Sequence, residues 1–412
     1  MIISRAYKVE LKPNNVQRTL LNKSIGCARL SYNWGLNLSI ERYEKGEDYL
    51  GAIGLHKELC KIKKSDYPFI YEVSKLAPQN SLRDLDQAFK NFFRGLKKKQ
   101  NVGFPKFKSK KNDKKSFRVD GLNIKVGHDF IKLPKISKIR LKESGYIPTE
   151  NVKYMNATIS KEIDRYYVSV SVQEDVNIED KLIEDIVGID MGIKELATCS
   201  DGEVFHNLKH TKKYERKLKR QQKKLSKKKD GSNNKYKQRM KVAKIHRKIR
   251  NSRTDGLHKI TSSITKTKCR IVVLENLNVK GMMKNHKLAK AIADASFYEF
   301  KRQLQYKTSF YGGQVYLIDR WFPSSKMCSS CGCLKEDLKL SDRTYNCDCG
   351  LSMDRDLNAA INIKNYFLKI QHTVSPTEIQ AFGETVSLSS NLLEPELVSV
   401  NKEMNRNLFA SC

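Results

Sequence analysis

The feature that most limits how this chain can fold is a group of cysteines between residues 328 and 349. Cys328 and Cys331 form one pair, and after fifteen intervening residues Cys347 and Cys349 form a second. Four thiolates at this spacing can close on one tetrahedral Zn²⁺ and leave no position for water, so the predicted ion is structural. The one-residue gap between Cys347 and Cys349 requires a tighter turn than the common two-residue spacing. Cys333 is a competing ligand, which we interpret as a free or outer-shell thiol.

Three acidic residues follow apolar or metal-binding segments at widely separated places. Asp190 ends an apolar strand over 186–190, and Glu275 follows a second apolar strand over 270–274. Asp356 lies at a helix start just after the second cysteine pair; Asp354 is the alternative, because the spacing does not separate the two. Each carboxylate alone is also compatible with a capping role. The carboxyl ends of strands in open α/β sheets are, however, where ligand sites form, so we expect the three to converge.

A converging set of carboxylates indicates metal-dependent chemistry. Asp190, Glu275 and Asp356 are the predicted ligands of two Mg²⁺ or Mn²⁺ ions about 3.5–4 Å apart, with Asp190 bridging them. In such a site one ion activates the attacking water and the other stabilises the leaving 3′ oxygen. The predicted reaction is phosphodiester cleavage.

The charge balance points to a polyanionic partner. The chain carries 79 Lys and Arg against 45 Asp and Glu, a formal net charge of +34, which far exceeds what solubility needs. No apolar run approaches the ~18 residues of a membrane span, and the first residues are too short an apolar run for a signal peptide. The clustered cysteines are typical of metal binding in a reducing compartment. We therefore predict a cytoplasmic protein without a membrane partner.

The first half of the chain alternates between strand and helix patterns. Residues 6–12 alternate with period two, residues 14–95 suit helices interrupted near 67–68 and 77–80, and residues 116–175 are strand-like again. Residues 157–161 and 166–172 flank a turn as in a β-hairpin. We predict a small β-barrel domain from 1–13 and 97–180, with a helical lobe, 14–96, inserted between its strands.

The second half has an α/β pattern, so the predicted fold class is multidomain, α/β plus all-β. The α/β domain is predicted over 181–322 and 351–371, with a zinc ribbon, 323–350, inserted in it. Within it, residues 209–253 hold 21 Lys or Arg and predict a basic helical hairpin; a disordered basic arm is the alternative. Further helices are expected over 257–267 and 291–310, and a poorly ordered tail over 372–412.

These segments together resemble a known family. The run from Gly188 to Gly192, the block Leu274–Leu277, the segment from Trp321 to Cys331 and the block from Cys347 to Asn362 are similar to motifs of the TnpB (OrfB) family of bacterial insertion sequences. The likeness extends over about residues 1–370. Members of the family look like compact ancestors of type V CRISPR effectors, with a RuvC-like (RNase H fold) nuclease domain, an inserted zinc ribbon, and N-terminal wedge and recognition lobes.

The resemblance implies an RNA-guided DNA endonuclease. Asp190, Glu275 and Asp356 match the three RuvC carboxylates, and the four cysteines match the ribbon's zinc ligands. The implied partners are a guide RNA and double-stranded target DNA, cut next to a short transposon-adjacent motif by one monomer per guide, with a dimer as the alternative. The basic hairpin is expected to contact the guide RNA or the guide–target duplex. The alternatives are a cleavage-inactive RNA-guided repressor and, less favoured, a strand-joining transposase.

Overall fold

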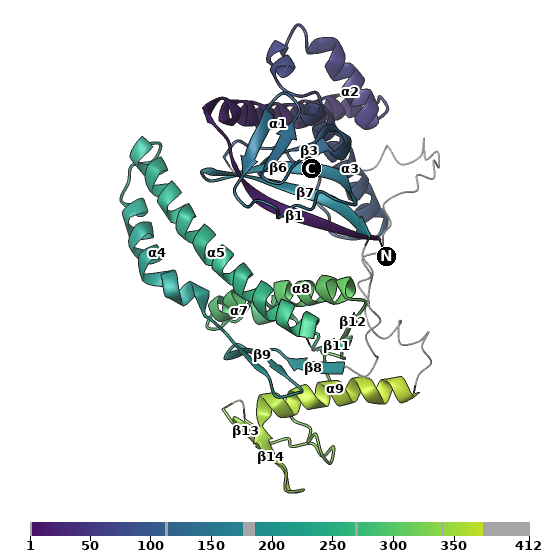
Figure 1. Cartoon of the computed structure of the whole chain (residues 1–412), viewed down its shortest axis with the longest axis vertical. Helices are drawn as coiled ribbons and strands as arrows, with labels where there is room; N and C mark the ends of the chain where they lie inside the picture. The colour runs from purple at the N-terminus through teal and green to yellow at the C-terminus, as the bar shows by residue number, and fades with distance from the viewer. Residues whose placement is uncertain (1, 112–113, 176–185, 268–270, 340, 374–412) are drawn as a thin grey trace. The chain divides into compact units, whose positions relative to one another are not determined.

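A computed structural model of the chain describes residues 2–111, 114–175, 186–267, 271–339 and 341–373, coloured along the chain in Figure 1. Residues 374–412, which include nearly all of the predicted tail, lie outside this part. The chain divides into two compact units: one from residues 1–179 and 214–249, the other from 180–213 and 250–412. No helix in the described ranges is both long and apolar enough to cross a membrane.

The first unit is built on a seven-stranded antiparallel sheet in the order β2-β6-β7-β1-β5-β4-β3. Its strands are β1 Ile2–Lys12, β2 Lys115–Asp120, β3 Lys125–Val126, β4 Phe130–Leu133, β5 Ser137–Leu141, β6 Val152–Glu162 and β7 Arg165–Asp175. β1 pairs with β7 from Ile2↔Asp175 to Leu11↔Tyr166, which confirms that the N-terminal strand joins the later sheet. The β6–β7 hairpin is also confirmed, with Glu162 opposite Arg165. β2 and β3 stand at the two ends of the ladder, and closure into a barrel stays a prediction.

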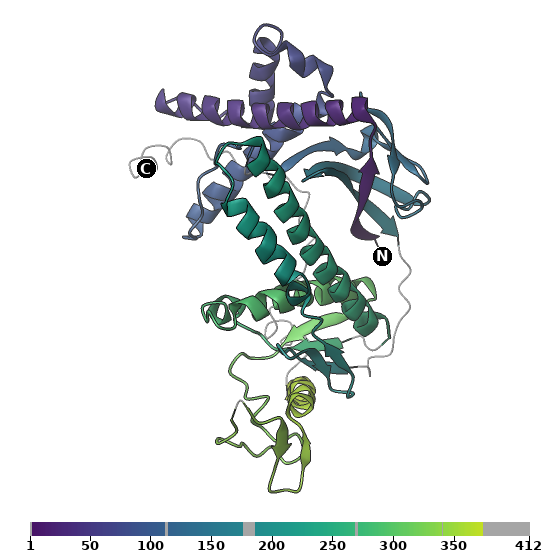
Figure 2. The ribbon, with the colours of Figure 1, turned by 90° about the vertical axis from the view of Figure 1, so that its left-hand side faces the viewer.

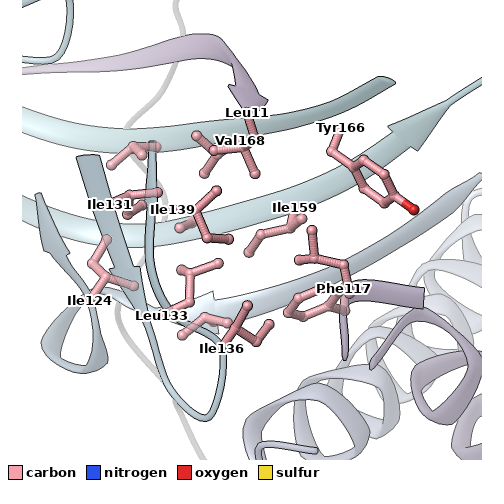
Figure 3. Packing of buried hydrophobic residues seen from close by; sticks show 14 of the residues in the cluster. Leu11, Phe117, Ile124, Ile131, Leu133, Ile136, Ile139, Ile159, Tyr166 and Val168 are labelled. Atoms are coloured by element: carbon pink, nitrogen blue, oxygen red, sulfur yellow. The ribbon is translucent and has the colours of Figure 1, made fainter. Parts of the chain in front are cut away.

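Alternation along these strands creates the core of the first unit. Side chains two residues apart point to the same face of a strand, and Figure 3 shows those of Val168, Ile159, Ile131 and Ile139 gathered on one side of the sheet. All four are fully buried. The helices of this unit close over the sheet edge, since Phe117 and Leu76 belong to the same buried cluster.

Three helices follow β1 in the chain: α1 Asn15–Glu44, α2 Gly51–Ile62 and α3 Leu76–Lys97, with a short 3₁₀ segment, Pro68–Glu72, before α3. A reciprocal capping box between Asn14 and Gln17 starts α1. The interruption predicted at 77–80 is wrong, because α3 runs through it. Pro78 lies in the first turn, where a proline's missing N–H has no intrahelical acceptor and costs the helix little.

The second unit contains a five-stranded mixed sheet in the order β10-β9-β8-β11-β12. Its strands are β8 Ile186–Asp190, β9 Glu195–Cys199, β10 Val204–His206, β11 Ile271–Leu274 and β12 Gln314–Leu317. β11 pairs in parallel with both β8 and β12. Helix α9, Arg355–Thr373, covers one face of the sheet, and α8, Phe297–Phe310, covers the other (Figure 1).

The remaining helices correct two predicted boundaries. Helix α5, Asn233–Thr267, is continuous, so the second arm of the basic hairpin and the predicted helix over 257–267 are one element. Its partner α4, His210–Ser226, runs alongside it (Figure 2), and Gln238 of α5 hydrogen-bonds Gln221 of α4. The helix predicted over 291–310 is instead split into α7, Ala289–Ala295, and α8. Ser296 between them adopts a left-handed conformation, φ 55°, which ends a right-handed helix.

Candidate functional site

The register of two parallel strands brings Asp190 and Glu275 together. Ile189 of β8 lies opposite Leu274 of β11, so the next residues of the two strands, Asp190 and Glu275, leave the sheet at neighbouring points of its carboxyl edge. Period-two alternation also places them on one face. Glu275 follows Ile271 and Val273, which pack in the apolar cluster formed with α9. Both carboxylates therefore lie on the face of the sheet that α9 covers.

Gly188 explains how α9 reaches this edge. A Cβ atom at position 188 would lie 2.3 Å from the carbonyl oxygen of Ala360 and 2.6 Å from the amide nitrogen of Lys364, both backbone atoms of α9. Only glycine permits so close an approach of helix and strand. Asp190 lies two residues beyond this contact along the strand, and Asp356 lies one helical turn before Ala360. Each spans about 6 Å from the contact, given the rise per residue of strand and helix.

Glu275 and Asp356 both act electrostatically on Asp190. Burial, together with the charges of Glu275 and Asp356, raises the pKa of Asp190 well above its ordinary value. Burial also raises the pKa of Glu275, opposed by a hydrogen bond from Ser324. The pKa of Asp356 is raised by burial and by the neighbouring charge of Asp354. Like charges held near one another in a partly dry site disfavour ionisation, and a cation in their midst reverses that.

The structure separates the roles of the two aspartates at the start of α9. Asp354 ends a short strand, β14 Ser352–Asp354, and its Oδ1 accepts hydrogen bonds from the backbone N–H groups of Asp356 and Leu357 at 2.9 and 3.1 Å. It is therefore the N-terminal cap of the helix. Asp356 lies in the first turn, and its carboxylate contributes to the field at Asp190. The capping role left open for Asp356 belongs to its neighbour.

The four cysteines form a compact cluster. Their sulfur atoms all lie within 4.8 Å of one another, with Cys328 to Cys349 and Cys331 to Cys347 both at 3.6 Å. A tetrahedron with Zn–S bonds of about 2.3 Å has sulfur–sulfur edges of about 3.8 Å, so this geometry fits a structural zinc ion. The one-residue spacing of the second pair is accommodated by a tight turn in which Gly350 N–H donates to the carbonyl of Cys347. Cys333 lies outside this four-sulfur group, although both its backbone and its side chain hydrogen-bond Cys331.

Within the described part of the chain, the cysteines are the only group of three or more potential ligands that meet this closely. The oxygens of Asp190, Glu275 and Asp356 therefore do not all lie within 4.8 Å of one another. Their hard oxygen atoms are nonetheless the donor set that Mg²⁺ prefers, and hence the site fits a divalent cation chemically.

Two buried asparagines of α9 tie the cysteine cluster to the carboxylates. Asn358 donates to the carbonyl of Met327 at 2.7 Å and accepts from the N–H of Ser329 at 3.0 Å. Asn362 donates to the carbonyls of Ser324 and Met327 at 2.8 and 2.6 Å. The hydroxyl of Ser324 in turn donates to Glu275 Oε1 at 2.6 Å. One helix thus holds the first cysteine turn, the strand-end glutamate and its own aspartate.

Sequence reasoning did not find the roles of Gly188, Ser324, Asn358 and Asn362. All four lie within segments that carry the family resemblance, but their contacts cross more than twenty residues of sequence. The available signal was compositional. Two asparagines one turn apart on an otherwise apolar helix face are unusual, because buried amides need partners.

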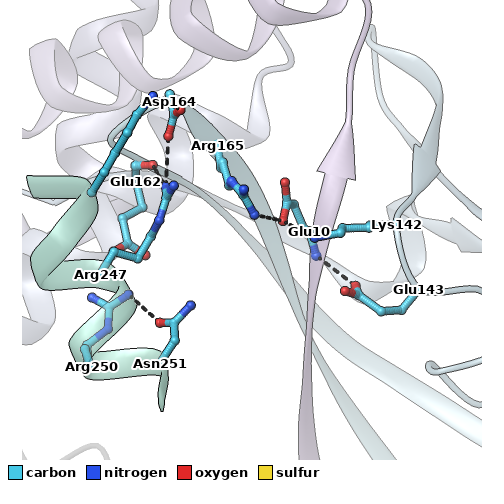
Figure 4. A network of polar contacts seen from close by, with 10 residues as sticks. Glu10, Lys142, Glu143, Glu162, Asp164, Arg165, Arg247, Arg250 and Asn251 are labelled. Atoms are coloured by element: carbon cyan, nitrogen blue, oxygen red, sulfur yellow. Dashed lines mark hydrogen bonds and ion pairs between the residues drawn. The ribbon is translucent and has the colours of Figure 1, made fainter. Parts of the chain in front are cut away.

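The basic hairpin is anchored to the sheet of the first unit. Arg247 of α5 donates to Asp164 at 2.9 Å (Figure 4). Lys244 pairs with the same carboxylate at 2.8 Å. Asp164 lies in the tight turn between β6 and β7. Although burial opposes it, hydrogen bonds from Lys244 and Arg247 lower the pKa of Asp164 to about 2. The hairpin is therefore an ordered element with a fixed attachment rather than a disordered arm.

Known proteins resemble the chain over most of its length. It is 35% identical over 364 residues to a protein of Streptomyces pristinaespiralis named "Putative RNA-guided DNA endonuclease", covering 88% of this chain and 89% of the relative. It is 32% identical over 377 residues to "Putative RNA-guided DNA endonuclease InsQ" of Escherichia coli K12, covering 87% and 91%. The family profile described as "Probable transposase", OrfB, matches residues 167–286. The chain belongs to the TnpB (OrfB) family.

Two further profiles match this TnpB-family chain. One described as "Cas12f1-like, TNB domain" matches residues 297–363, which include all four cysteines and Asp356. One described as "Helix-turn-helix domain" matches residues 1–48, where the structure has strand β1 followed by the single helix α1. The fold also resembles the protein in a cryo-EM structure of a Cas12f1–sgRNA–target DNA complex, with a TM-score of 0.54, 15% identity, and coverage of 88% of this chain and 99% of the other.

Proposed function

We propose that this protein is an RNA-guided DNA endonuclease of a bacterial insertion sequence, which cuts double-stranded DNA beside a short transposon-adjacent motif. The observation that carries the proposal is the convergence of Asp190, Glu275 and Asp356 on one edge of the sheet, where burial and the charges of Glu275 and Asp356 raise the pKa of Asp190. Carboxylates that are costly to ionise together are expected where a cation completes the site. The names of the full-length relatives support guidance by RNA.

Different residues of the chain would bind the catalytic cations, position the ligands and hold the structural metal. Asp190, Glu275 and Asp356 would hold Mg²⁺ or Mn²⁺, with Asp190 between the other two ligands. The bound cations would activate water and neutralise charge at the leaving 3′ oxygen. Ser324 holds Glu275 in orientation through its hydrogen bond. Cys328, Cys331, Cys347 and Cys349 would hold a structural Zn²⁺ that keeps the ribbon closed.

The charge distribution fits recognition through a guide. Base pairing between guide and target reads sequence, so the protein needs only to hold nucleic acid backbones and read a short duplex motif. A net charge of +34 provides electrostatic attraction to nucleic acid backbones. Because binding releases counterions, the affinity should depend strongly on salt concentration. We propose the basic hairpin, 209–253, as a contact with the guide RNA or the guide–target duplex. We also propose that residues 1–13 and 97–180 form the wedge domain and that residues 14–96 form the recognition lobe.

The test is to purify the protein from cells that carry its native flanking DNA, to sequence the copurified RNA, and to add a plasmid with the matching target. We expect cutting with Mg²⁺, none with EDTA, and none for Asp190→Ala, which should keep guide-dependent DNA binding. Asp201→Ala, an exposed turn residue that follows β9 in the same unit, is the matched control and should cut normally. Bound but uncut DNA with wild-type protein would instead favour a repressor. Absence of a discrete RNA would overturn both and favour a transposase.

A further inference from the structure

A cavity of about 200 Å³ adjoins the carboxylates at the end of β11. Glu275 forms part of its wall, so the cavity and the proposed cleavage centre share a side chain. Met191 and Phe297, both buried, give it an apolar floor. Three cations, Lys280, Lys301 and Arg320, line its remaining wall, and Glu275 is its one acidic residue.

The lining of this cavity includes an exposed aromatic ring. Tyr298 is the second residue of α8 and is 70% exposed, so its ring is accessible to a stacking partner. Within the described residues, Lys280 and Arg320 form no ion pair with a carboxylate. Arg320 uses only its Nε, which donates to the carbonyl of Asn276 at 3.4 Å. The cavity thus combines an exposed aromatic ring with two cations, Lys280 and Arg320, that have no carboxylate partner among the described residues.

We propose that this cavity binds a nucleotide of an unpaired DNA strand directly beside the bond that is cut. The base stacks on Tyr298 over the apolar floor, and Lys280 and Arg320 hold the adjoining phosphates. Proteins that hold single strands combine aromatic stacking with a basic groove in this way. The inference rests on the proposed function, because it takes Glu275 as part of the cleavage centre. Its consequence is that the strand is held at the end of β11 by the carboxylates and by the adjoining cavity, which share Glu275.

The alternative is that Tyr298 is an ordinary surface tyrosine of a very basic protein and has no role in binding. That alternative predicts no difference between Tyr298 and other exposed tyrosines. Tyr236 of the basic hairpin, 62% exposed, provides the matched control, because it has similar exposure and basic surroundings but belongs to the other unit.

The experiment uses the full chain as purified, in the Asp190→Ala background, with single-stranded DNA oligonucleotides. One set carries 5-iododeoxyuridine for photo-crosslinking to aromatic side chains, and peptides are mapped by mass spectrometry. A second set carries 2-aminopurine, whose fluorescence falls when the base stacks. We expect a crosslink at Tyr298 and quenching that Tyr298→Ala reduces at least severalfold, Tyr298→Phe retains, and Tyr236→Ala leaves unchanged. The Phe variant separates stacking from a hydrogen bond by the hydroxyl.

The cations are tested by the salt dependence of binding. Lys280→Gln and Arg320→Gln should each lower the slope of log affinity against log salt concentration by about 0.7, the value for one single-strand phosphate contact. Crosslinks that map to Trp321 but not to Tyr298, or equal quenching in Tyr298→Ala, would overturn the proposal. Because these readouts need neither guide nor cleavage, a protein that crosslinks at Tyr298 but cuts no guided target would refute the proposed function and leave this site standing.

Discussion

The contact between Gly188 and α9 gives the sharpest test of how the site is built. In Gly188→Ala, the new Cβ would lie 2.3 Å from the Ala360 carbonyl oxygen, whereas an ordinary carbon–oxygen contact is about 3.3 Å. The difference requires the helix to retreat by roughly 1 Å, because the clashing atoms are backbone and no side chain can rotate away. Overpacking of this kind costs about 1–3 kcal/mol of stability.

The same displacement moves a proposed catalytic residue. Asp356 lies one turn before Ala360 on the displaced helix, whereas Asp190 and Glu275 stay on the sheet. A misplacement of about 1 Å lowers rates by about 10²-fold. We therefore expect Gly188→Ala to reduce single-turnover cleavage about 100-fold at saturating guide and Mg²⁺, with guide RNA retained. The rate is measured well below the melting temperature, so that lost stability and lost activity remain separate.

The matched control is Gly26→Ala in α1, where an added Cβ meets nothing within 4 Å. A helix-interior glycine replaced by alanine should stabilise the protein by about 0.5–1 kcal/mol and leave cleavage unchanged. Cleavage at the wild-type rate in Gly188→Ala, with the expected loss of stability, would show that α9 does not position Asp356 for the reaction. That result would refute the reasoning.

Three further outcomes are expected. Asp190→Asn should melt at a higher temperature than the wild type at neutral pH without divalent cations, and an unchanged or lower melting temperature would contradict this. The raised pKa of Asp190 means that the native state binds more protons than the unfolded state. The stability of the wild type therefore falls as the pH rises above about 4 through the raised value. Cys331→Ser should lose zinc by elemental analysis and expose residues 325–350 to protease, whereas Cys333→Ser keeps the metal; zinc lost from both would place Cys333 among the ligands. Asn362→Ala removes two hydrogen bonds to backbone carbonyls, which should lower the free energy of unfolding by about 2 kcal/mol and slow cleavage because Ser324 shifts. Unaltered cleavage would show that this asparagine does not position Glu275 through Ser324.

The sequence predicts best what depends on short-range periodicity and on residue chemistry. The strand before Asp190, the strand before Glu275 and the β6–β7 hairpin all follow from local alternation. The cysteine spacing likewise predicts the cluster, because a metal's preferred donors and geometry constrain few residues strongly. A general rule about strand ends predicts that Asp190 and Glu275 lie near one another, and the register of β8 and β11 places them at neighbouring points of the sheet edge.

The predicted helix boundaries are wrong where a single backbone angle or a tertiary contact determines where the helix ends. Nothing in the sequence around Ser296 requires a left-handed residue, yet that conformation separates α7 from α8. The continuity of α5 through Gly256 was also missed. Glycine weakens a helix by only about 1 kcal/mol relative to alanine, and packing of Leu257 and Ile264 in the core of the second unit outweighs that penalty.

The positioning residues escaped for a different reason, which bears on how the site works. Gly188, Ser324 and Asn362 carry no chemistry of their own, so no motif based on reactive groups reveals them. Their common partner is α9: Gly188 admits it, Asn362 extends from it, and Ser324 connects it to Glu275. Displacing this helix would therefore disturb Asp356 directly and Glu275 through Ser324. The segment that carries the cysteine cluster can thus govern the geometry of the carboxylates, even though its four thiolates offer no position for a reacting water.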